Sequence, residues 1–276
     1  MVNPSESLIR EMKRRRYSNQ TIKTYVGCLE RFLKWCRKPV NKITKKDVRL
    51  FLEKYSDEGK AGSTLNVNLM CLKFYFEQVL GRKMWVDIKY SKVLKKIQRV
   101  LSKKEVRRLI GQIDNWKHKL MIELMYSAGM RVSEVVNLRV KDVCFDGGYG
   151  FVRKGKGRKD RLFVLSKIVG EKIKNLIEME DLDKEGYVFI SNRGRKYNIR
   201  TLQVIVKKAS KLAELKDWKE VHCHTLRHSF ATHLIENEYC VGDVQAMLGH
   251  KSPETSLGYI HSSGKMLNVK SPFDEK

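Results

Sequence analysis

The sequence lacks the features of an exported or membrane-embedded protein. No stretch approaches the roughly 18 consecutive apolar residues that a membrane-spanning helix needs, and the opening MVNPSESLIREMKRRR has no apolar signal-peptide core. The six cysteines include no Cys-x-x-Cys pair, and most stand among apolar neighbours, as reduced core thiols do. These absences predict a cytoplasmic protein without disulfides and without a membrane partner.

Motifs for common cofactors are missing as well. The sequence contains no P-loop and no cluster of carboxylates that would bind a divalent cation. It also shows no internal repeat and no low-complexity segment. We therefore expect no cofactor, no metal ion and no nucleotide at the functional site.

Acidic residues are scarce relative to basic ones. The 276 residues include 31 Asp and Glu against 57 Lys and Arg, a formal net charge of +26. Such a surface repels itself unless a polyanion normally binds it, and nucleic acid is the commonest such partner. A basic surface of the ribosomal type is the alternative that composition leaves open. The hydrophobic content of 42% is enough for a folded core.

The hydrophobic pattern divides the chain into two helical regions. Residues 1–81 predict a four-helix domain, in which Ser18 and Thr44 cap helices whose apolar residues recur at spacings of three and four. Residues 82–100 carry seven basic residues, one acidic residue and no sustained apolar period. This composition predicts a basic interdomain linker that follows a phosphate backbone, with a merely solvated tether as the alternative.

Residues 101–276 predict a second, mostly helical domain with a small antiparallel sheet. Ser102 and Glu105 form a capping box at its start. Helices are expected over 106–113, 119–127, 167–179 and 201–213, and again from 225 onward. Glycines separate three short β-rich runs, 143–145, 149–153 and 161–165, and a further short strand is expected at 187–190. The expected fold class is thus mainly α with a small antiparallel β-sheet, in two domains.

Two segments of the second domain carry cations in places unusual for packing residues. In SAGMRVSEVVNL, Arg131 lies in a turn after Gly129. A cation held in a turn is better placed to bind an anion than to pack in an apolar core. In RKGKGRKDR, Lys156 lies between two glycines that let the backbone approach a ligand. A solvated hairpin explains this second segment equally well.

Two further segments add histidines, another arginine and a tyrosine. In HTLRHSFATHL, His224 lies at a helix start, where exposed amides favour an anion, and Arg227 follows on the same face. In MLGHKSPETSLGYIH, His250 follows a helix-ending glycine and Tyr259 follows a Pro-initiated helix, a position usual for a packing residue. Taken together, the four segments favour a phosphodiester site, because they combine several cations and a tyrosine without paired carboxylates.

A zinc site is the competing interpretation of the histidines. His224 and His228 are four residues apart, as helical zinc ligands often are. No acidic or cysteine ligand follows at a supporting spacing, and Arg227 would place a cation beside the metal. We therefore expect no metal here, and we interpret His228 and His233 as packing or surface residues.

The order Arg…Lys…His-x-x-Arg…His…Tyr of these segments resembles that of the tyrosine site-specific recombinases of the phage integrase family, above all the Xer type in its archaeal form. The resemblance implies a SAM-like core-binding domain at 1–81 and a catalytic domain at 101–276. It implies that the two domains form a C-shaped clamp around double-stranded DNA. It also implies a tetramer on DNA and a monomer or dimer without it.

The resemblance assigns four of the motif residues to the phosphate. Tyr259 would be the nucleophile that forms a 3′-phosphotyrosyl link. Arg131 and Arg227 would bind the non-bridging oxygens, which carry more negative charge in the transition state than in the ground state. His250 would donate a further hydrogen bond to the same phosphate.

Three other residues would handle protons or support the site. By the same resemblance, His224 would act on the proton of the tyrosine, as general base or positioning group, and Lys156 would protonate the leaving 5′-oxygen. Glu134 would orient its neighbours. All six catalytic positions hold a suitable residue, which disfavours a DNA-binding protein that keeps the scaffold without cutting.

The expected role within the family is resolution of chromosome dimers at a dif-like site before cell division. The compact chain, without an extra arm-binding domain, favours this role. An integrase of a phage or plasmid is the alternative.

Overall fold

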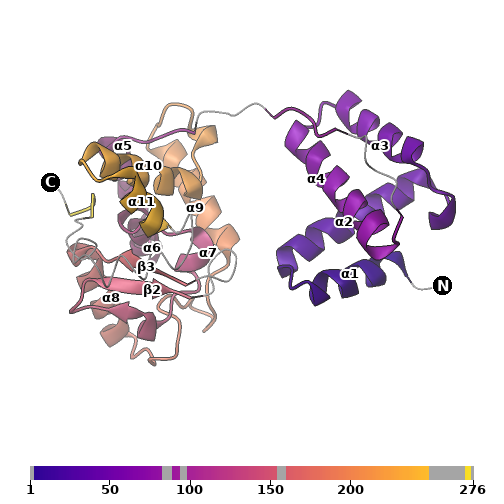
Figure 1. Ribbon diagram of the computed structural model, residues 1–276. Coiled ribbons are helices and arrows are strands. Elements are labelled where there is room, and N and C mark those ends of the chain that lie inside the picture. Colours follow the sequence, from indigo (N-terminus) through magenta and orange to yellow (C-terminus); the bar gives the residue numbers. More distant parts are fainter. Residues whose placement is uncertain (1–2, 83–88, 94–97, 154–159, 249–270, 275–276) are drawn as a thin grey trace. The chain divides into compact units, whose positions relative to one another are not determined.

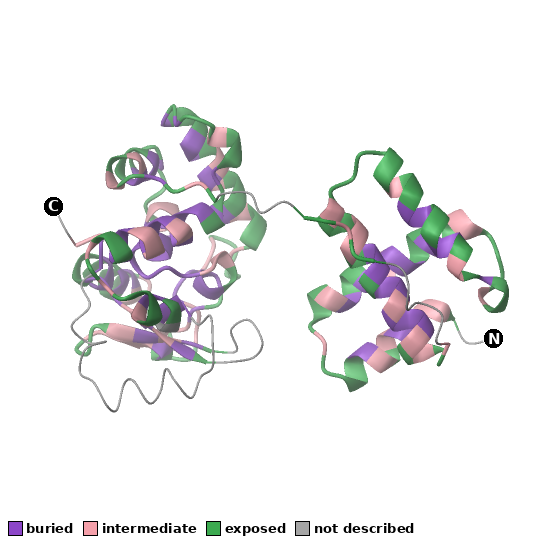
Figure 2. Cartoon of the chain, turned by 45° about the horizontal axis from the view of Figure 1, so that its top comes forward, coloured by how far each residue is buried: buried purple, intermediate pink, exposed green. Residues whose placement is uncertain are grey.

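The computed structural model describes residues 3–82, 89–93, 98–153, 160–248 and 271–274. The chain divides into two compact units, residues 1–96 and 97–276 (Figure 1). Each unit encloses its own apolar core, which appears as the purple interior in Figure 2. No helix in the described ranges is long and apolar enough to cross a membrane.

The first unit is built from four α-helices. They are α1 (Pro4–Arg14), α2 (Asn19–Cys36), α3 (Lys45–Asp57) and α4 (Gly62–Lys73), with a 3₁₀ turn at Val40–Lys42 and a π-helix at Phe74–Val79. The predicted caps are present: the side chain of Ser18 accepts a hydrogen bond from the amide of Thr21, and Thr44 forms a capping box with Asp47. These local bonds satisfy amides that a helix leaves open at its start.

Aromatic side chains fill the core of the first unit. Phe32 of α2 makes edge-to-face contacts with Phe51 and Phe76, with ring centroids 5.2 and 6.3 Å apart. Residues 74–76 are three consecutive buried aromatics. Helix α4 continues directly into the π-helix, whose wider turn accommodates the three large side chains in the interior.

The described parts of the segment predicted as a linker are bonded to one unit or the other: Arg99, near its end, donates hydrogen bonds to Glu105 and Asp217 of the second unit. Arg82 donates hydrogen bonds to the carbonyl oxygens of Val40 and Ile43, at 3.0 and 2.9 Å. Asn66 of α4 exchanges two hydrogen bonds with the backbone of Ser91. Arg82 and Ser91 are therefore held against the first unit.

The second unit combines helices with a small sheet. Its α-helices in the described ranges are α5 (Lys103–Gly111), α6 (Trp116–Ser127), α7 (Val132–Val135), α8 (Lys167–Met179), α9 (Ile199–Leu212), α10 (Cys223–Glu236) and α11 (Val241–Leu248). The strands β1 (Val143–Cys144), β2 (Tyr149–Val152) and β3 (Arg161–Val164) form an antiparallel sheet in the order β1-β2-β3. Short 3₁₀ turns span Val140–Asp142 and Trp218–Glu220. The predicted fold class, mainly α with a small antiparallel sheet, is confirmed.

The strand predicted at 187–190 is wrong. This segment makes only isolated bridges, between Tyr187 and Arg139 and between Ile190 and Lys196. Val188 and Phe189 are both fully buried, so the segment lacks the alternation of a half-buried strand. Its apolar side chains pack in the core, but the backbone of the segment has no neighbouring strand with which it pairs continuously.

Helix α6 is the central element of the second unit. Every residue from 120 to 127 is buried, and the helix contacts α8, α9 and α10. The turn that follows α6 is therefore held inside the unit, beside α7 and α10 (Figure 1). This placement brings a polar turn next to the core.

The described end of the chain folds back on the same unit. Ser271 donates a hydrogen bond to the carbonyl oxygen of Ser127 at 2.7 Å. Asp274 accepts hydrogen bonds from the Ser166 hydroxyl at 2.5 Å and from the Lys167 amide at 3.2 Å, at the start of α8. Residues 271–274 thus join the end of α6 to the beginning of α8.

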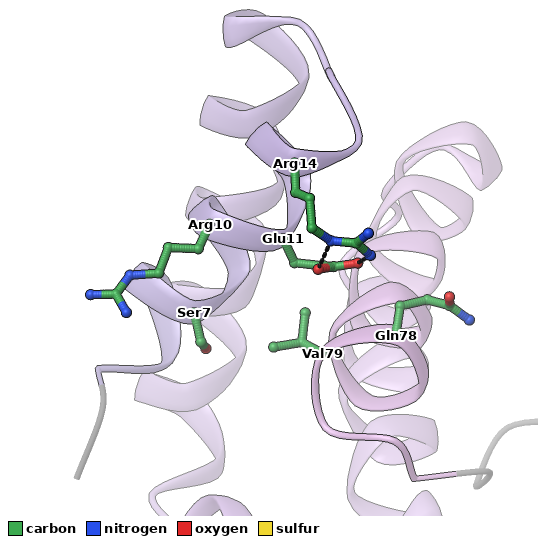
Figure 3. Close-up of a pocket in the computed structure, with 6 residues that line it drawn as sticks. All are labelled: Ser7, Arg10, Glu11, Arg14, Gln78 and Val79. Atoms are coloured by element: carbon green, nitrogen blue, oxygen red, sulfur yellow. Dashed lines mark hydrogen bonds and ion pairs between the residues drawn. The ribbon is translucent and has the colours of Figure 1, made fainter.

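A hollow of about 290 Å³ lies on the first unit, between α1 and the π-helix (Figure 3). Glu11 is the acidic residue in its lining, and its carboxylate already accepts hydrogen bonds from Arg14 and Arg15. These bonds lower the pKa of Glu11 to about 2. Because this acid is fully paired, the hollow offers no reactive group, and the candidate site lies in the second unit.

Candidate active site

The turn between α6 and α7 positions Arg131. Gly129 has a positive φ of 58°, and a Cβ atom there would lie 2.4 Å from the ring of Phe230 on α10. Glycine is thus required both by the backbone conformation and by the close approach of α10. Two residues later Arg131 caps α7, so its direction is set by the turn and by the short helix together.

Glu134 is the centre of the site. Its Oε1 accepts a hydrogen bond from Arg131 Nη1 at 2.7 Å, and its Oε2 accepts one from the Arg131 amide at 2.9 Å. The same Oε2 accepts a hydrogen bond from Arg161 Nη2 at 2.6 Å, and Arg227 Nη1 lies 3.9 Å from it. One buried carboxylate is therefore surrounded by three guanidinium groups. We call Arg131, Arg161, Arg227 and Glu134 the arginine cluster.

The arginine cluster carries an excess of positive charge, because three guanidinium groups face one carboxylate. Burial raises the pKa of Glu134, but the charge of Arg161 and the hydrogen bonds from Arg131 outweigh it and hold the pKa below its ordinary 4.5. Burial and the charges of Arg161 and Arg131 lower the pKa of Arg227. Guanidinium groups stay protonated at neutral pH, so the excess charge persists and favours an anion.

Arg131 is the member of the arginine cluster that is open to a ligand. Its side chain is 16% exposed, against 4–6% for the other three members. Nη1 is bonded to Glu134, whereas Nε and Nη2 have no hydrogen-bond partner among the residues that the structure describes. A fixed guanidinium with two unused nitrogen donors matches the oxygens of a phosphate group.

Arg227 is held between two other elements. It lies on α10, whose start is fixed by a hydrogen bond from the His222 amide to the Thr225 hydroxyl at 3.0 Å. Its Nη1 donates to the carbonyl oxygen of Gly129 at 2.6 Å, and its Nη2 donates to that of Leu248, the last residue of α11. These bonds orient the guanidinium beside Glu134.

The three histidines of α10 occupy different environments. His224 is exposed in the first turn, three residues before the buried Arg227. His228 is half-buried, and burial together with the charge of Arg227 lowers its pKa. His233 is buried and its Nδ1 lies 2.7 Å from the hydroxyl of Tyr126. His233 is therefore a packing residue, as the sequence predicts.

The remaining predicted site residues lie outside the described residues. They are Lys156, in the segment 154–159 between β2 and β3, and His250 and Tyr259, in the segment 249–270 that follows α11. The structure thus brings together Arg131, Glu134 and Arg227 and places His224 on the helix of Arg227.

Arg161 is the functional candidate that sequence reasoning missed. It is 7% exposed and begins β3, where it pairs with Val152 of β2. Burial alternates along this strand, with Arg161 and Phe163 inward and Leu162 and Val164 less buried. Because Leu162 and Val164 are apolar as well, the sequence of β3 does not show this alternation, and it gives no signal that Arg161 is buried.

The described residues contain no group of three or more His, Cys, Asp or Glu side chains that could hold a metal ion. His224 and His228 therefore have no third ligand within those ranges.

Two known protein families match the chain, one over each unit. The phage integrase family matches residues 99–266, and the N-terminal SAM-like domain of phage integrases matches residues 5–85. A tyrosine recombinase of Thermosipho africanus is 34% identical over 90% of both chains. Tyrosine recombinase XerA of Pyrococcus horikoshii is 33% identical over 91% of this chain and 86% of its own.

A solved structure supports the fold. The site-specific recombinase XerH, in a pre-cleavage complex with its difH substrate, matches with a TM-score of 0.70 and 25% identity, over 95% of this chain and 82% of XerH. Most of the length of each relative is covered, so the likeness extends across both units. The chain therefore belongs to the phage integrase family and is a tyrosine recombinase that resembles the archaeal XerA proteins.

Proposed function

We propose that this recombinase cleaves and rejoins double-stranded DNA through a 3′-phosphotyrosyl intermediate at Tyr259. The observation that carries the proposal is the arginine cluster, in which a fixed, partly exposed Arg131 keeps two nitrogen donors available beside excess positive charge. A DNA phosphate supplies the missing negative charge. The formal net charge of +26 provides the wider attraction to the polyanion.

In the proposed reaction, the phenol oxygen of Tyr259 attacks the scissile phosphorus. A bond forms between that oxygen and phosphorus while the bond to the 5′-oxygen breaks. The phenol proton passes to His224, and Lys156 gives a proton to the departing 5′-hydroxyl. Rejoining runs the same steps in reverse, with the 5′-hydroxyl as nucleophile. One phosphoester replaces another, so the exchange is close to energy-neutral and no nucleotide is consumed.

The arginines act on the transition state. Phosphorus becomes five-coordinate, and its non-bridging oxygens gain negative charge relative to the ground state. Arg131 and Arg227, already oriented by Glu134 and by backbone carbonyls, face that charge without reorganising. His250 donates an additional hydrogen bond to the same oxygens.

The proposed substrate is a dif-like site on the chromosome, and the proposed role is resolution of chromosome dimers. Support comes from the likeness to XerA proteins and to XerH, which was solved on its difH substrate. Four copies would assemble on two duplexes, because exchange between two sites requires cleavage of four strands. Integration of a mobile element remains the second candidate and differs only in the DNA that is bound.

A trapping experiment tests both parts of the proposal. The protein is expressed in cells, covalent protein–DNA complexes are isolated in denaturing detergent, and the attached DNA is sequenced. We expect adducts from the wild type and none from Tyr259→Phe, while Tyr187→Phe, a change outside the predicted site, forms them normally. Adducts from the Tyr259→Phe variant would reassign the nucleophile.

The sequenced DNA separates the two substrates. Adducts concentrated at one chromosomal locus would support a dif-like site. Adducts at the ends of mobile elements would support an integrase instead.

A further inference from the structure

The geometry points to Arg161 as a positioning residue of the recombination reaction, which acts through Glu134 and through the end of α11. This inference rests on the proposed function, because the groups that Arg161 positions are those assigned to the phosphate. Arg161 itself is buried and at the start of β3.

Arg161 occupies the carboxylate oxygen of Glu134 that Arg227 could otherwise bind. Glu134 Oε2 accepts a hydrogen bond from Arg161 Nη2 at 2.6 Å, whereas Arg227 Nη1 lies 3.9 Å from the same oxygen. Without Arg161, this oxygen would keep only its hydrogen bond from the Arg131 amide, and Arg227 is the next cation within reach. A direct pair between Glu134 and Arg227 would withdraw positive charge from a phosphate. Arg161 therefore keeps Arg227 from being neutralised.

The second contact of Arg161 is with α11. Its Nη1 donates a hydrogen bond to the carbonyl oxygen of Met247 at 2.8 Å, and Arg227 Nη2 donates to that of Leu248. The last carbonyls of a helix have no partner within it and carry the negative end of its dipole. Two guanidinium groups thus bind successive carbonyls where the helix ends. His250 is three residues beyond Met247 in the sequence.

Three hydrogen bonds determine the orientation of Arg161: those to Glu134 and Met247, and one from Nη1 to the carbonyl oxygen of Leu162 at 3.1 Å. Its Nε is buried without a hydrogen-bond partner in the described part of the chain. A buried donor without a partner is unfavourable, so the side chain gives up one bond to make the Nη contacts. The planar fork of arginine reaches Glu134 and α11 at once, which the single ammonium group of lysine cannot do.

The test compares variants of the full chain with a matched control. Arg161→Gln removes the charge, and Arg161→Lys keeps it without the fork, which provides a second variant if the first fails to fold. Lys172→Gln is the control, because Lys172 also pairs with a carboxylate that is 4% exposed, that of Glu123, outside the arginine cluster.

The first readout is independent of activity. Carbon NMR of the Glu134 carboxyl measures its pKa, which the charge of Arg161 helps to hold below the ordinary value. We expect the pKa to rise in Arg161→Gln, to rise less in Arg161→Lys, and to stay unchanged in Lys172→Gln. An unchanged Glu134 pKa in both Arg161 variants would overturn the inference.

The second readout is the single-turnover rate of adduct formation on a nicked duplex that carries the trapped sequence. We expect Arg161→Gln to slow this rate about 10-fold, but to have little further effect when Glu134→Gln is already present, because groups that act through each other are not additive. Equal slowing in both backgrounds would show an independent role and would overturn the inference. If the wild type forms no adduct, the proposed function fails, and the Glu134 pKa alone decides whether Arg161 positions that carboxylate.

Discussion

The guanidinium of Arg227 donates a hydrogen bond to the carbonyl oxygen of Gly129 at 2.6 Å, across a separation of 98 residues. The bond joins α10 to the turn that carries Arg131. Both arginines assigned to the phosphate are therefore oriented by one short piece of backbone. A change in that turn should disturb both.

Gly129→Ala should destabilise the second unit and slow adduct formation. The residue has a positive φ, and its new Cβ would lie 2.4 Å from Phe230. Strain and crowding together should reduce the free energy of unfolding by about 2–4 kcal/mol. Chemical denaturation measures the change. Gly194→Ala is the control, because Gly194 also has a positive φ but nothing within 4 Å of its Cβ position, so roughly 1 kcal/mol is expected. Equal losses for the two variants would contradict the crowding at Gly129.

Arg131→Lys should retain DNA binding and lose cleavage. Lysine keeps the charge but cannot hold Glu134 and present two further donors to a phosphate at the same time. The adduct rate should fall roughly 100-fold, as for the loss of a transition-state donor. Gel-shift titration and single-turnover trapping measure binding and rate separately. A loss of affinity with an unchanged rate would show that Arg131 serves binding only.

The stability of the second unit should fall in acid because of Glu134. Its folded pKa is lower than 4.5, so the unfolded chain binds more protons than the folded one in the window between the two values. The stabilisation is complete above pH 4.5 and is lost as pH falls through the folded pKa. Urea unfolding across this range should show the loss in the wild type and a flatter profile in Glu134→Gln. Identical profiles would mean that Glu134 is not stabilised in its charged form.

Asp274→Ala should loosen the start of α8. The carboxylate accepts hydrogen bonds from the Ser166 hydroxyl and from the amides of Lys167 and Ile168. Loss of this cap should cost about 1 kcal/mol and should speed amide hydrogen exchange in the first turn of α8. Mass spectrometry of exchange measures the effect, with the exposed Asp114→Ala as control. Unchanged exchange at 167–169 would show that residues 271–274 do not dock there in solution.

Features set by local sequence were predictable. Caps such as Ser18, Thr44 and Ser102 are confirmed, because a cap depends on residues only three positions apart. The grouping of Arg131, Glu134 and Arg227 could be anticipated only from the family motifs, since the sequence alone does not show which segments meet. The structure places these three residues together.

Features set by distant packing were not predictable. Arg161 looked like one more cation of a basic hairpin, and only the positions of α11 and Glu134 show that it is buried. Residues 187–190 looked like a strand, but their partner could not be read from the segment itself. The contact of Ser271 with Ser127 joins residues 144 positions apart and leaves no local pattern.

Each of the two apolar cores is formed by one continuous stretch of the sequence. The buried residues of the first lie between Leu8 and Phe76, and those of the second between Leu101 and Leu248. As the chain leaves the ribosome, the first unit has all the residues of its core before those of the second are made. The arginine cluster needs residues from 131 to 248 and therefore cannot be complete before Leu248 has been made. A nascent chain that has already folded its first unit thus still lacks the complete arginine cluster, which is the proposed phosphate site.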